Sequence, residues 1–329
     1  MYSDHVGYIE NDVYDIYGCD SCDAQFVSPL KVDPKLYDII YSDRTNEIGP
    51  AGYGQHLIQA KKISNHDKPL EFLIETDINY SVVGDYLKDK KNLDILEVGA
   101  GYGYLTYALK KLNHNSFGID ISRVTIDYAL QTFGPNYKCA DLESFIGSIG
   151  NNRKFDLIIA IELVEHLSNP EKFIKNCFSI LKPNGRVLIT TPNKGYYRKG
   201  SIWISDLPPV HLFWLSPKTF NYIAEENGLN LKYFDLASHI LKHDKINLLI
   251  NYLRSREKIR IRPHVFKASG ELNLENHNSL NQPSLLKKLV RFILVDIAPI
   301  RILSNFLYRK IINPKFPNTS TQALLLWRG

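Results

Sequence analysis

The sequence predicts an α/β protein built on a doubly wound, mostly parallel sheet of seven strands with helices on both faces. Three observations lead to this prediction. From residue 93 onward, short apolar runs alternate with segments of helical periodicity. The first of these runs leads directly into a glycine-rich turn, "EVGAGYG", which opens a helix. The run "KFDLIIAIEL" at 154–163 is the most apolar of them.

The expected elements follow one another along the chain. Residues 46–91 are predicted to be helical. Strands are expected at 94–98, 116–122, 137–142, 154–163 and 186–193, from Leu229, and at 322–329. Helices are expected at 104–111, at 123–133, at 169–185, where Pro183 and Gly185 close the helix, and from Ser216-Pro217 onward.

These elements divide the chain into four parts. Residues 1–45 form a small N-terminal module rich in Tyr and Asp, and residues 46–237 form the catalytic α/β domain. Residues 319–329 return to this domain as its final strand. Residues 238–318 are therefore a basic helical insertion ahead of the last strand, and long insertions at the end of a sheet are usually functional.

The bulk composition, 44% hydrophobic and 23% charged, is that of a soluble globular protein. The acidic N-terminus shows no signal peptide, and no run approaches the roughly 18 apolar residues of a membrane helix. Four cysteines do not make a disulfide framework, so the cytoplasm is the expected compartment. From Leu241 to Gly329 there are 16 Lys and Arg against 5 Asp and Glu, a net +11 that leaves −6 on the rest. This asymmetry is evidence about partners.

The turn after the first strand indicates the ligand. Glycine stands at 99, 101 and 103, with Glu97 just ahead, so backbone N–H groups and a helix N-terminus are open to a ligand. A dinucleotide-binding turn needs glycine at its first, third and sixth positions, and the sixth here is Tyr104. The pattern E-x-G-x-G-x-G instead resembles motif I of the class I S-adenosylmethionine-dependent methyltransferases. Their Rossmann-like sheet ends with an antiparallel strand between its fifth and sixth strands.

This resemblance implies that S-adenosylmethionine is the cofactor and that acidic residues at successive strand ends hold it. Asp120, at the end of the second strand, would accept hydrogen bonds from the ribose hydroxyls. Asp141, after the third strand, would accept one from the adenine amino group. The cofactor-binding residues that the resemblance implies are Glu97, Gly99, Ala100, Gly101, Gly103, Asp120, Ile121, Asp141, Leu142 and Glu162.

The segment "IELVEHLSNP" after the fourth strand carries the expected chemistry. Glu162, Glu165 and His166 are spaced i, i+3 and i+4, so a helical turn would place them on one face. His211 follows in "DLPPVHLFWLSPKTF". The pattern Glu-x-x-Glu-His with a later His resembles the methyltransferases of ubiquinone biosynthesis and of small-RNA 2′-O-methylation, which hold a divalent cation at such a site.

Two interpretations of these residues are open, and both make His211, His166 and Glu165 the expected catalytic residues. In the first, Glu162, Glu165, His166 and His211 bind a cation such as Mg²⁺ or Mn²⁺, which lowers the pKa of a coordinated hydroxyl. In the second, no metal binds and His211 acts as a general base or contacts the substrate. A purely structural role is the remaining alternative.

The segment from 191 to 220 resembles the broad group of ubiquinone-type methyltransferases, which includes many enzymes of sugar and glycan methylation. The ubiquinone enzymes themselves are shorter and lack the N-terminal module and the insertion. We therefore expect O-methylation of a sugar, a glycan or another polyhydroxylated small molecule. The alternatives are a quinone precursor, a 2′-hydroxyl of RNA, or a non-catalytic cofactor-binding module.

Two further segments concern metals and partners. "YGCDSCDAQF" resembles the second half of a zinc ribbon, but only Cys19 and Cys22 of the four thiolates are present, so zinc is not expected there. Residues 284–316 mix apolar positions with lysines and arginines. They are expected to form an amphipathic lid or a dimer contact, or to contact the inner face of an anionic membrane. No nucleic-acid module is evident, and the oligomeric state is open.

Overall fold

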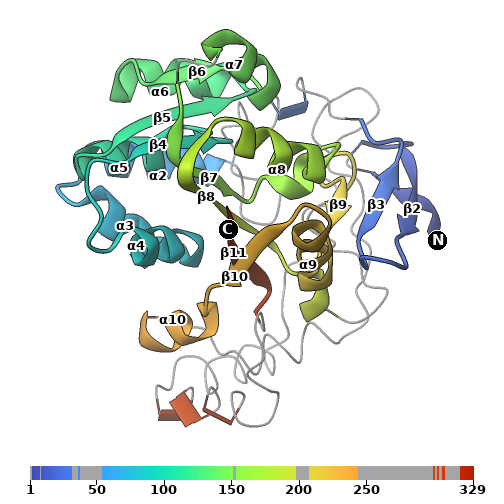
Figure 1. Ribbon diagram of the computed structural model, residues 1–329. Coiled ribbons are helices and arrows are strands. Elements are labelled where there is room, and N and C mark those ends of the chain that lie inside the picture. The colour runs from blue at the N-terminus through green and yellow to red at the C-terminus, as the bar shows by residue number, and fades with distance from the viewer. Residues whose placement is uncertain are drawn as a thin grey trace.

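The computed structural model describes residues 2–7, 9–31, 36–37, 54–150, 153–197, 207–243, 299–300, 302–303, 306–307 and 319–329. Its largest feature is a seven-stranded sheet in the order β10-β11-β8-β7-β4-β5-β6 (Figure 1). The strands are β4 (Asp94–Val98), β5 (Asn115–Asp120), β6 (Tyr137–Cys139), β7 (Phe155–Ile161), β8 (Leu181–Pro192), β10 (Leu229–Tyr233) and β11 (Thr321–Arg328).

Five neighbouring strands of this sheet run parallel. β4 pairs with β5 and β7, β5 pairs with β6, and β7 pairs with β8, all in parallel register. β11 is antiparallel to both β8 and β10, so the last strand of the chain lies between the fifth and sixth of the sheet. The predicted doubly wound α/β sheet with an antiparallel final strand is confirmed.

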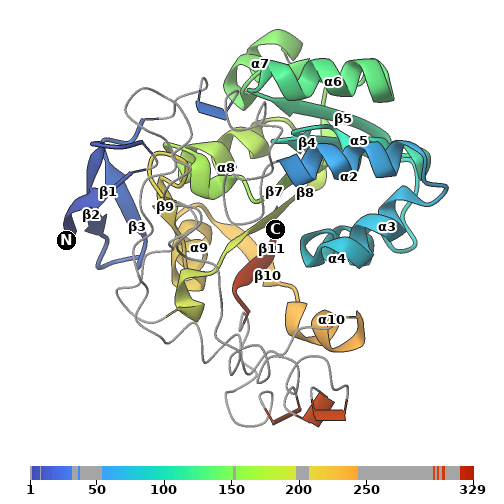
Figure 2. The same ribbon diagram turned by 180° about the vertical axis from the view of Figure 1, so that it is seen from behind.

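Helices cover both faces of the sheet. α8 (Pro170–Ser179) and α9 (Pro217–Glu226) cover the face seen in Figure 1, and α2 (Gly54–Ser64) and α5 (Tyr104–Lys111) cover the face seen in Figure 2. The other helices are α3 (Pro69–Thr76), η1 (Ile78–Tyr80), α4 (Ser81–Leu87), α6 (Arg123–Phe133), α7 (Leu142–Ile149), η2 (Val164–His166), η3 (Lys194–Tyr196) and α10 (Leu236–His243). Within the described part of 46–91, the predicted helices are present.

The central strand β7 divides the core into two layers. Leu157 and Ile159 pack into the cluster that contains α2 and α5, whereas Ile158 and Ala160 pack into the cluster that contains α8 and α9. Successive side chains of a strand point to opposite faces, so a strand covered on both faces must be apolar throughout. All four side chains are fully buried.

The helix expected over 169–185 is shorter than predicted. α8 ends at Ser179, and β8 begins at Leu181. Pro183 lacks an N–H group and disfavours helical backbone at the residue before it, Lys182. The Lys182 ammonium is held instead by Asp94 and Asp156, with Nζ to Oδ2 distances of 2.5 and 2.8 Å. The prediction placed the end of the helix too late because its closing residues belong to the strand.

The N-terminal strands form a second sheet that includes a strand of the catalytic domain. Its order is β1 (Tyr2–Val6), β2 (Val13–Gly18), β3 (Gln25–Ser28) and β9 (Phe213–Trp214). Ile16, Val27, Leu212 and Trp214 are fully buried together in its core. The boundary at residue 45 stays a prediction, but in packing the module shares this small core with the chain just before α9.

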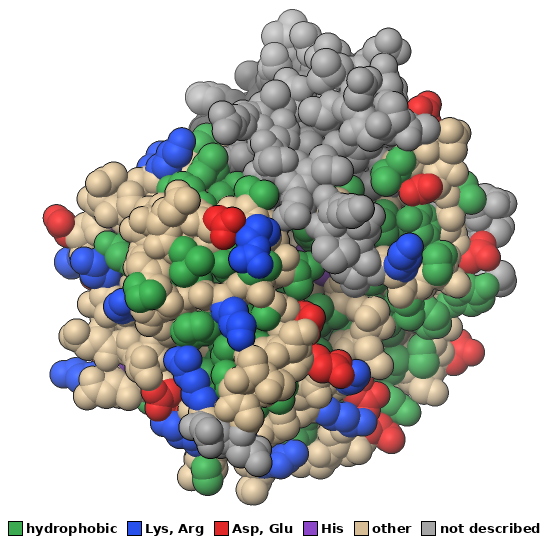
Figure 3. Space-filling view, turned by 90° about the horizontal axis from the view of Figure 1, so that it is seen from above, with side chains coloured by type: hydrophobic (Ala, Val, Ile, Leu, Met, Phe, Trp, Pro, Cys, Tyr) green, Lys and Arg blue, Asp and Glu red, His purple; other side chains and the backbone are tan. Residues whose placement is uncertain are grey.

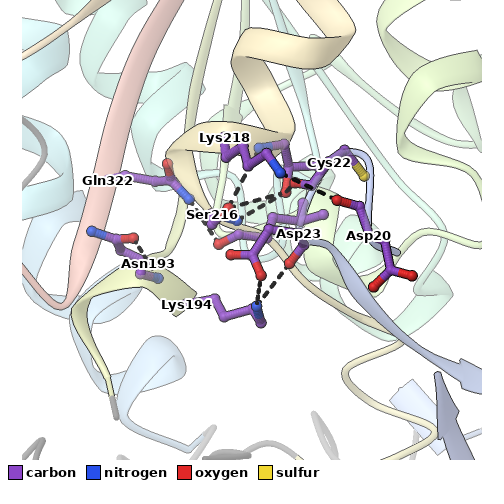
Figure 4. A network of polar contacts seen from close by, with 11 residues as sticks. Asp20, Cys22, Asp23, Asn193, Lys194, Ser216, Lys218 and Gln322 are labelled. Carbon is purple, nitrogen blue, oxygen red and sulfur yellow. Dashed lines mark hydrogen bonds and ion pairs between the residues drawn. The ribbon is translucent and has the colours of Figure 1, made fainter. Parts of the chain in front are cut away.

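The turn between β2 and β3 also contacts the catalytic domain (Figure 4). Lys194 Nζ lies 2.7 Å from both the main-chain oxygen and the carboxylate Oδ1 of Asp23. The Thr219 hydroxyl donates a hydrogen bond of 2.9 Å to the carbonyl of Cys22. Both partners lie near the N-terminus of α9, so the module is attached to the domain at this turn as well as along β9.

Most of the insertion at 238–318, including most of the basic segment at 284–316, lies outside the described residues. In the described part of that segment, Ile302, Leu303 and Phe306 are 65, 59 and 53% exposed. The lid, dimer and membrane interpretations therefore stay predictions. Among the helices that the structure describes, none is long and apolar enough to cross a membrane. On the surface seen from above, described basic and acidic side chains are interspersed (Figure 3).

Candidate functional site

A cavity of about 730 Å³ lies at the carboxyl ends of the parallel strands. Residues at the ends of β4, β5, β7 and β8 and just after β6 line it, which is where open α/β sheets bind ligands. Tyr37, His56 and Asp77, from segments that precede the sheet, line it as well. The predicted site residues that line it are Glu97, Gly99, Ala100, Gly101, Asp120, Ile121, Asp141, Leu142, Glu162, Glu165, His166 and His211.

The glycine turn after β4 follows a backbone path that favours glycine. Gly99 has a φ of +78° and Gly101 a φ of +50°. A Cβ added at Gly99 would lie 3.0 Å from Leu163 Cδ1, so the loop after β7 closely approaches this turn. The N–H of Gly101 donates to Asp120 Oδ2 at 2.8 Å. The turn thus follows β4, contacts the loop after β7 and is hydrogen-bonded to the end of β5.

Gly103 does not line the cavity, and this corrects the cofactor contact predicted for it. A Cβ at this position would lie 2.5 Å from Tyr137 Cε1 and 2.7 Å from the Cβ of Ala129. The Tyr137 hydroxyl donates to the Gly103 carbonyl at 2.7 Å. Glycine is needed here for the packing of α5 against α6 and β6, and sequence spacing alone could not separate packing from ligand contact.

Glu97 lines the cavity and also stabilises the first turn of α5. Its Oε2 accepts hydrogen bonds from the N–H of Thr106 at 2.8 Å and from the Thr106 hydroxyl at 2.5 Å. The side chain is almost completely buried, and this burial raises its pKa to about 8. Through these bonds Glu97 joins β4 to α5 across the glycine turn.

Asp120 lies at the end of β5, where the resemblance places the acceptor of the ribose hydroxyls. Its Oδ2 accepts from Gly101 N and its Oδ1 accepts from Ser122 N, both at 2.8 Å. A carboxylate oxygen has two lone pairs, so each oxygen keeps acceptor capacity toward the cavity. Asp120 therefore both holds the glycine turn and presents negative charge to a bound ligand.

Asp141 caps α7 at the edge of the cavity. Its Oδ1 accepts from Ser144 N at 2.8 Å, and its Oδ2 accepts from the Ser144 hydroxyl at 2.9 Å. Leu142 and Ile121 line the cavity beside it, with 6% and 36% of their surfaces exposed. Two apolar side chains with an acceptor at the edge suit a flat heterocycle such as adenine.

Glu162 lies apart from the other members of the predicted cation site. It has a φ of +48°, and its N–H donates to the Thr190 carbonyl at 3.0 Å. The helical turn η2 begins only at Val164. Glu162 therefore still belongs to the end of β7, and the prediction that it shares a helical face with Glu165 and His166 is wrong.

Glu165, His166 and His211 form the only group of three metal-ligand side chains within the described ranges. Their donor atoms all lie within 4.8 Å of one another. Glu165 and His211 are buried, with 1% and 3% exposed. Glu165 Oε2 accepts from the Thr191 hydroxyl at 2.8 Å, and Glu165 Oε1 lies 3.8 Å from His166 Nε2.

The two imidazoles of this group are suited to act as ligands. His166 Nδ1 lies 2.7 Å from the Val210 carbonyl, which can only accept, so Nδ1 carries the proton and Nε2 of the neutral ring has the lone pair. Burial lowers the pKa of His211 to about 3, so this ring is neutral at pH 7. One carboxylate and two neutral imidazoles are ligands that fit a divalent cation.

The sequence analysis missed a polar cluster on the other side of the glycine turn. The Tyr80 hydroxyl donates to Tyr104 Oη at 3.0 Å, and Tyr104 Oη lies 3.0 Å from His56 Nδ1. Asp77 lines the cavity beside them, and burial raises its pKa. Residues 46–91 were considered only as helices, and no local spacing indicates that His56 and Asp77 meet.

Cys19 and Cys22 carry free thiols in the turn between β2 and β3. They do not belong to any group of three metal-ligand side chains within the residues that the structure describes. The expectation that this pair does not bind zinc stays a prediction.

Comparison with known proteins identifies similar enzymes. Residues 79–233 match a family described as a methyltransferase domain. The chain is 31% identical over 206 residues to a ubiquinone biosynthesis O-methyltransferase of Coxiella burnetii, in an alignment that covers 56% of the chain and 85% of that protein. A mitochondrial ubiquinone biosynthesis O-methyltransferase of Mus musculus is 29% identical over 223 residues, with 60% of each chain covered.

Solved structures of methyltransferases are also similar. A SAM-dependent methyltransferase from Archaeoglobus fulgidus aligns with 82% of the chain and 98% of its own length, at 17% identity and a TM-score of 0.43. A magnesium protoporphyrin IX methyltransferase from Synechocystis, solved with bound SAM, aligns with 63% of the chain and 92% of its own length, at 17% identity and a TM-score of 0.39.

Proposed function

The chain belongs to the class I S-adenosylmethionine-dependent methyltransferases, and we propose that it methylates a phenolic hydroxyl of a quinone precursor beside a second oxygen. The enzyme class, the cofactor and transfer to oxygen follow from its relatives. Their names place them in ubiquinone biosynthesis, which favours a quinone precursor over the sugar or glycan expected from the sequence.

One structural observation supports this proposal: the donor atoms of Glu165, His166 and His211 converge at the cavity that the glycine turn also lines. Methyl transfer from a sulfonium requires alignment of the reacting atoms and an oxygen nucleophile that has lost its proton. A group that promotes this loss must lie in the same cavity as the cofactor. The three side chains meet this requirement.

The same three side chains would hold a divalent cation, which when bound supplies the positive charge that lowers the pKa of a hydroxyl. Glu165 supplies a carboxylate that the Thr191 hydroxyl orients at 2.8 Å. His166 and His211 supply neutral rings. Since three protein ligands leave positions open, an acceptor with two neighbouring oxygens would complete the site.

A sugar or glycan is the second candidate, because neighbouring sugar hydroxyls present the same pair of oxygens. The observation that favours it is the N-terminal sheet, which packs with the segment that carries His211. Tyr37, which lines the cavity, also lies outside the matched domain at 79–233. An additional wall of this kind is consistent with an acceptor different from that of the shorter relatives.

The proposal is tested by supplying labelled S-adenosylmethionine with Mg²⁺ and one acceptor at a time. The acceptors are 3,4-dihydroxybenzoate, its 3-methoxy product analogue, a set of nucleotide sugars and an RNA with free 2′-hydroxyls. We expect label in the dihydroxybenzoate and none in the analogue whose second oxygen is already methylated. Label only in the nucleotide sugars would establish the second candidate, and label only in the RNA would refute both.

A further inference from the structure

The carbonyl of Val210 accepts from two side chains that come from opposite ends of the site. His166 Nδ1 lies 2.7 Å from this oxygen, and the Tyr37 hydroxyl donates to it at 3.2 Å. A carbonyl oxygen has two lone pairs, so it accommodates both donors. Tyr37 and His166 are therefore joined through one main-chain atom, although they lie in the N-terminal module and the catalytic domain.

The Tyr37 ring also contacts His166 directly. The two rings meet edge to face with their centroids 6.0 Å apart, and His211 meets the same imidazole edge to face at 4.6 Å. With Nδ1 bonded to Val210 and rings of Tyr37 and His211 against it, the imidazole of His166 has little rotational freedom. A ligand nitrogen held in this way is pre-organised.

The main chain around Val210 is held from both sides. The N–H of Leu212 donates to the carbonyl of Glu165 at 2.8 Å, and the N–H of Val27 donates to the carbonyl of Leu212 at 3.0 Å. The segment that carries His211 is thus bonded to η2 on one side and to β3 of the N-terminal module on the other. The module reaches the candidate cation site through main-chain bonds and through Tyr37.

We propose that Tyr37 is a positioning residue of the active site, which fixes the His166 imidazole through the Val210 carbonyl and through ring contact. The N-terminal module is then a part of the acceptor site rather than a separate accessory unit. This inference rests on the proposed function, because it assigns to His166 a role in holding the cation or the acceptor. Tyr37 itself acts through His166 and Val210.

The test compares Tyr37→Phe with Tyr17→Phe in the full-length protein. Tyr37→Phe removes the hydroxyl and keeps the ring. Tyr17→Phe removes a hydroxyl from the same module, where the ring stacks on Phe26 with centroids 5.8 Å apart. Three quantities are measured for each: affinity for S-adenosylhomocysteine by calorimetry, affinity for Mn²⁺ by electron paramagnetic resonance, and kcat and KM with 3,4-dihydroxybenzoate.

For Tyr37→Phe we expect unchanged affinity for S-adenosylhomocysteine, Mn²⁺ affinity weakened by about 10-fold, and a lower kcat, since the loss of a supporting hydrogen bond weakens metal sites by about this factor or more. Tyr17→Phe should match the wild type in all three. A merely structural role of Tyr37 predicts lower affinity for S-adenosylhomocysteine together with a lower melting temperature.

The wild type separates a failure of this inference from a failure of the proposed function. If the wild type binds Mn²⁺ or methylates the probe and Tyr37→Phe does so equally well, the inference is refuted and the proposed function stands. If the wild type binds no Mn²⁺ but turns over, the kcat of Tyr37→Phe alone decides. If the wild type does neither, the proposed function fails and the inference falls with it.

Discussion

The imidazole rings of His166 and His211 meet edge to face with their centroids 4.6 Å apart, although one follows β7 and the other precedes β9. The pKa of His211, lowered to about 3 by burial, makes this ring a poor proton acceptor at neutral pH and a good source of a lone pair. Of the two interpretations from the sequence, this favours a cation site over His211 as the general base.

We therefore expect turnover to fall at least 10-fold in EDTA and to return with Mg²⁺ or Mn²⁺, since a bound cation contributes several kcal/mol to such reactions. Glu165→Gln should lower turnover strongly because it removes the charged ligand. Glu171→Gln, an exposed carboxylate of α8 that pairs with Lys175, is the matched control and should behave as the wild type. Full wild-type activity in EDTA would exclude the cation interpretation.

The parts of the fold that were predicted correctly are those with a strong local signal. The apolar run that became β7, the glycine turn and the Ser216-Pro217 start of α9 each carry their structure in neighbouring residues. Asp120 was placed beside the cavity because strand ends of a parallel sheet share one edge.

The errors share the opposite property, which is dependence on distant contacts. Glu162 stays in strand geometry because its N–H bonds to Thr190 of the neighbouring strand, and this bond overrides the helical spacing. The contact of Tyr37 with Val210 spans 173 positions of the chain. Spacing within a short window contains no information about such pairs.

Asp120 provides the test of the cofactor site. Asp120→Ala should weaken binding of S-adenosylmethionine by about 10-fold or more, because hydrogen bonds to a charged acceptor are worth about 1.5–3 kcal/mol. The substitution also removes the acceptor of Gly101 N. Asp127→Asn, which alters an exposed carboxylate of α6, is the control. Calorimetry should show no binding of NAD to the wild type, and equal affinity of Asp120→Ala and wild type for S-adenosylmethionine would refute the ribose assignment.

The Cys19–Cys22 pair predicts a low zinc content. Two thiolates supply half of a tetrahedral zinc site, so protein purified without added zinc should contain clearly less than one equivalent by atomic absorption. Cys22→Ser should leave this value unchanged. One equivalent of zinc in the wild type that is lost in Cys22→Ser would show that the module supplies further ligands.

The basic insertion predicts peripheral contact with anionic membranes. Exposed Ile302, Leu303 and Phe306 lie in a part of the chain with a net charge of +11 from Leu241 onward. The protein should co-sediment with phosphatidylglycerol vesicles more than with phosphatidylcholine vesicles, and less at high salt. Phe306→Ser should reduce binding, whereas Val13→Ser, at a 58% exposed position of β2, should not. Equal, weak sedimentation with both vesicle types would favour a lid or a dimer contact.

The buried carboxyl of Glu97 predicts a pH dependence of stability. Its pKa is raised to about 8 in the folded chain from the model-compound value of 4.5. Between these two values the folded state keeps a proton that the unfolded state has lost, so the free energy of unfolding falls as pH rises from about 4.5 to 8 and is then constant. The contribution is at most about 1.4 kcal/mol for each pH unit.

Glu97→Gln removes this titration while its amide oxygen still accepts from the N–H and hydroxyl of Thr106. Relative to the wild type, the variant should therefore gain stability steadily between pH 5 and 8, as measured by urea denaturation at several pH values. Glu71→Gln, at an exposed position of α3, should give a curve parallel to that of the wild type. A parallel curve for Glu97→Gln as well would mean that Glu97 is already ionised in the folded protein, and that its negative charge, rather than a protonated carboxyl, holds the start of α5 beside the glycine turn.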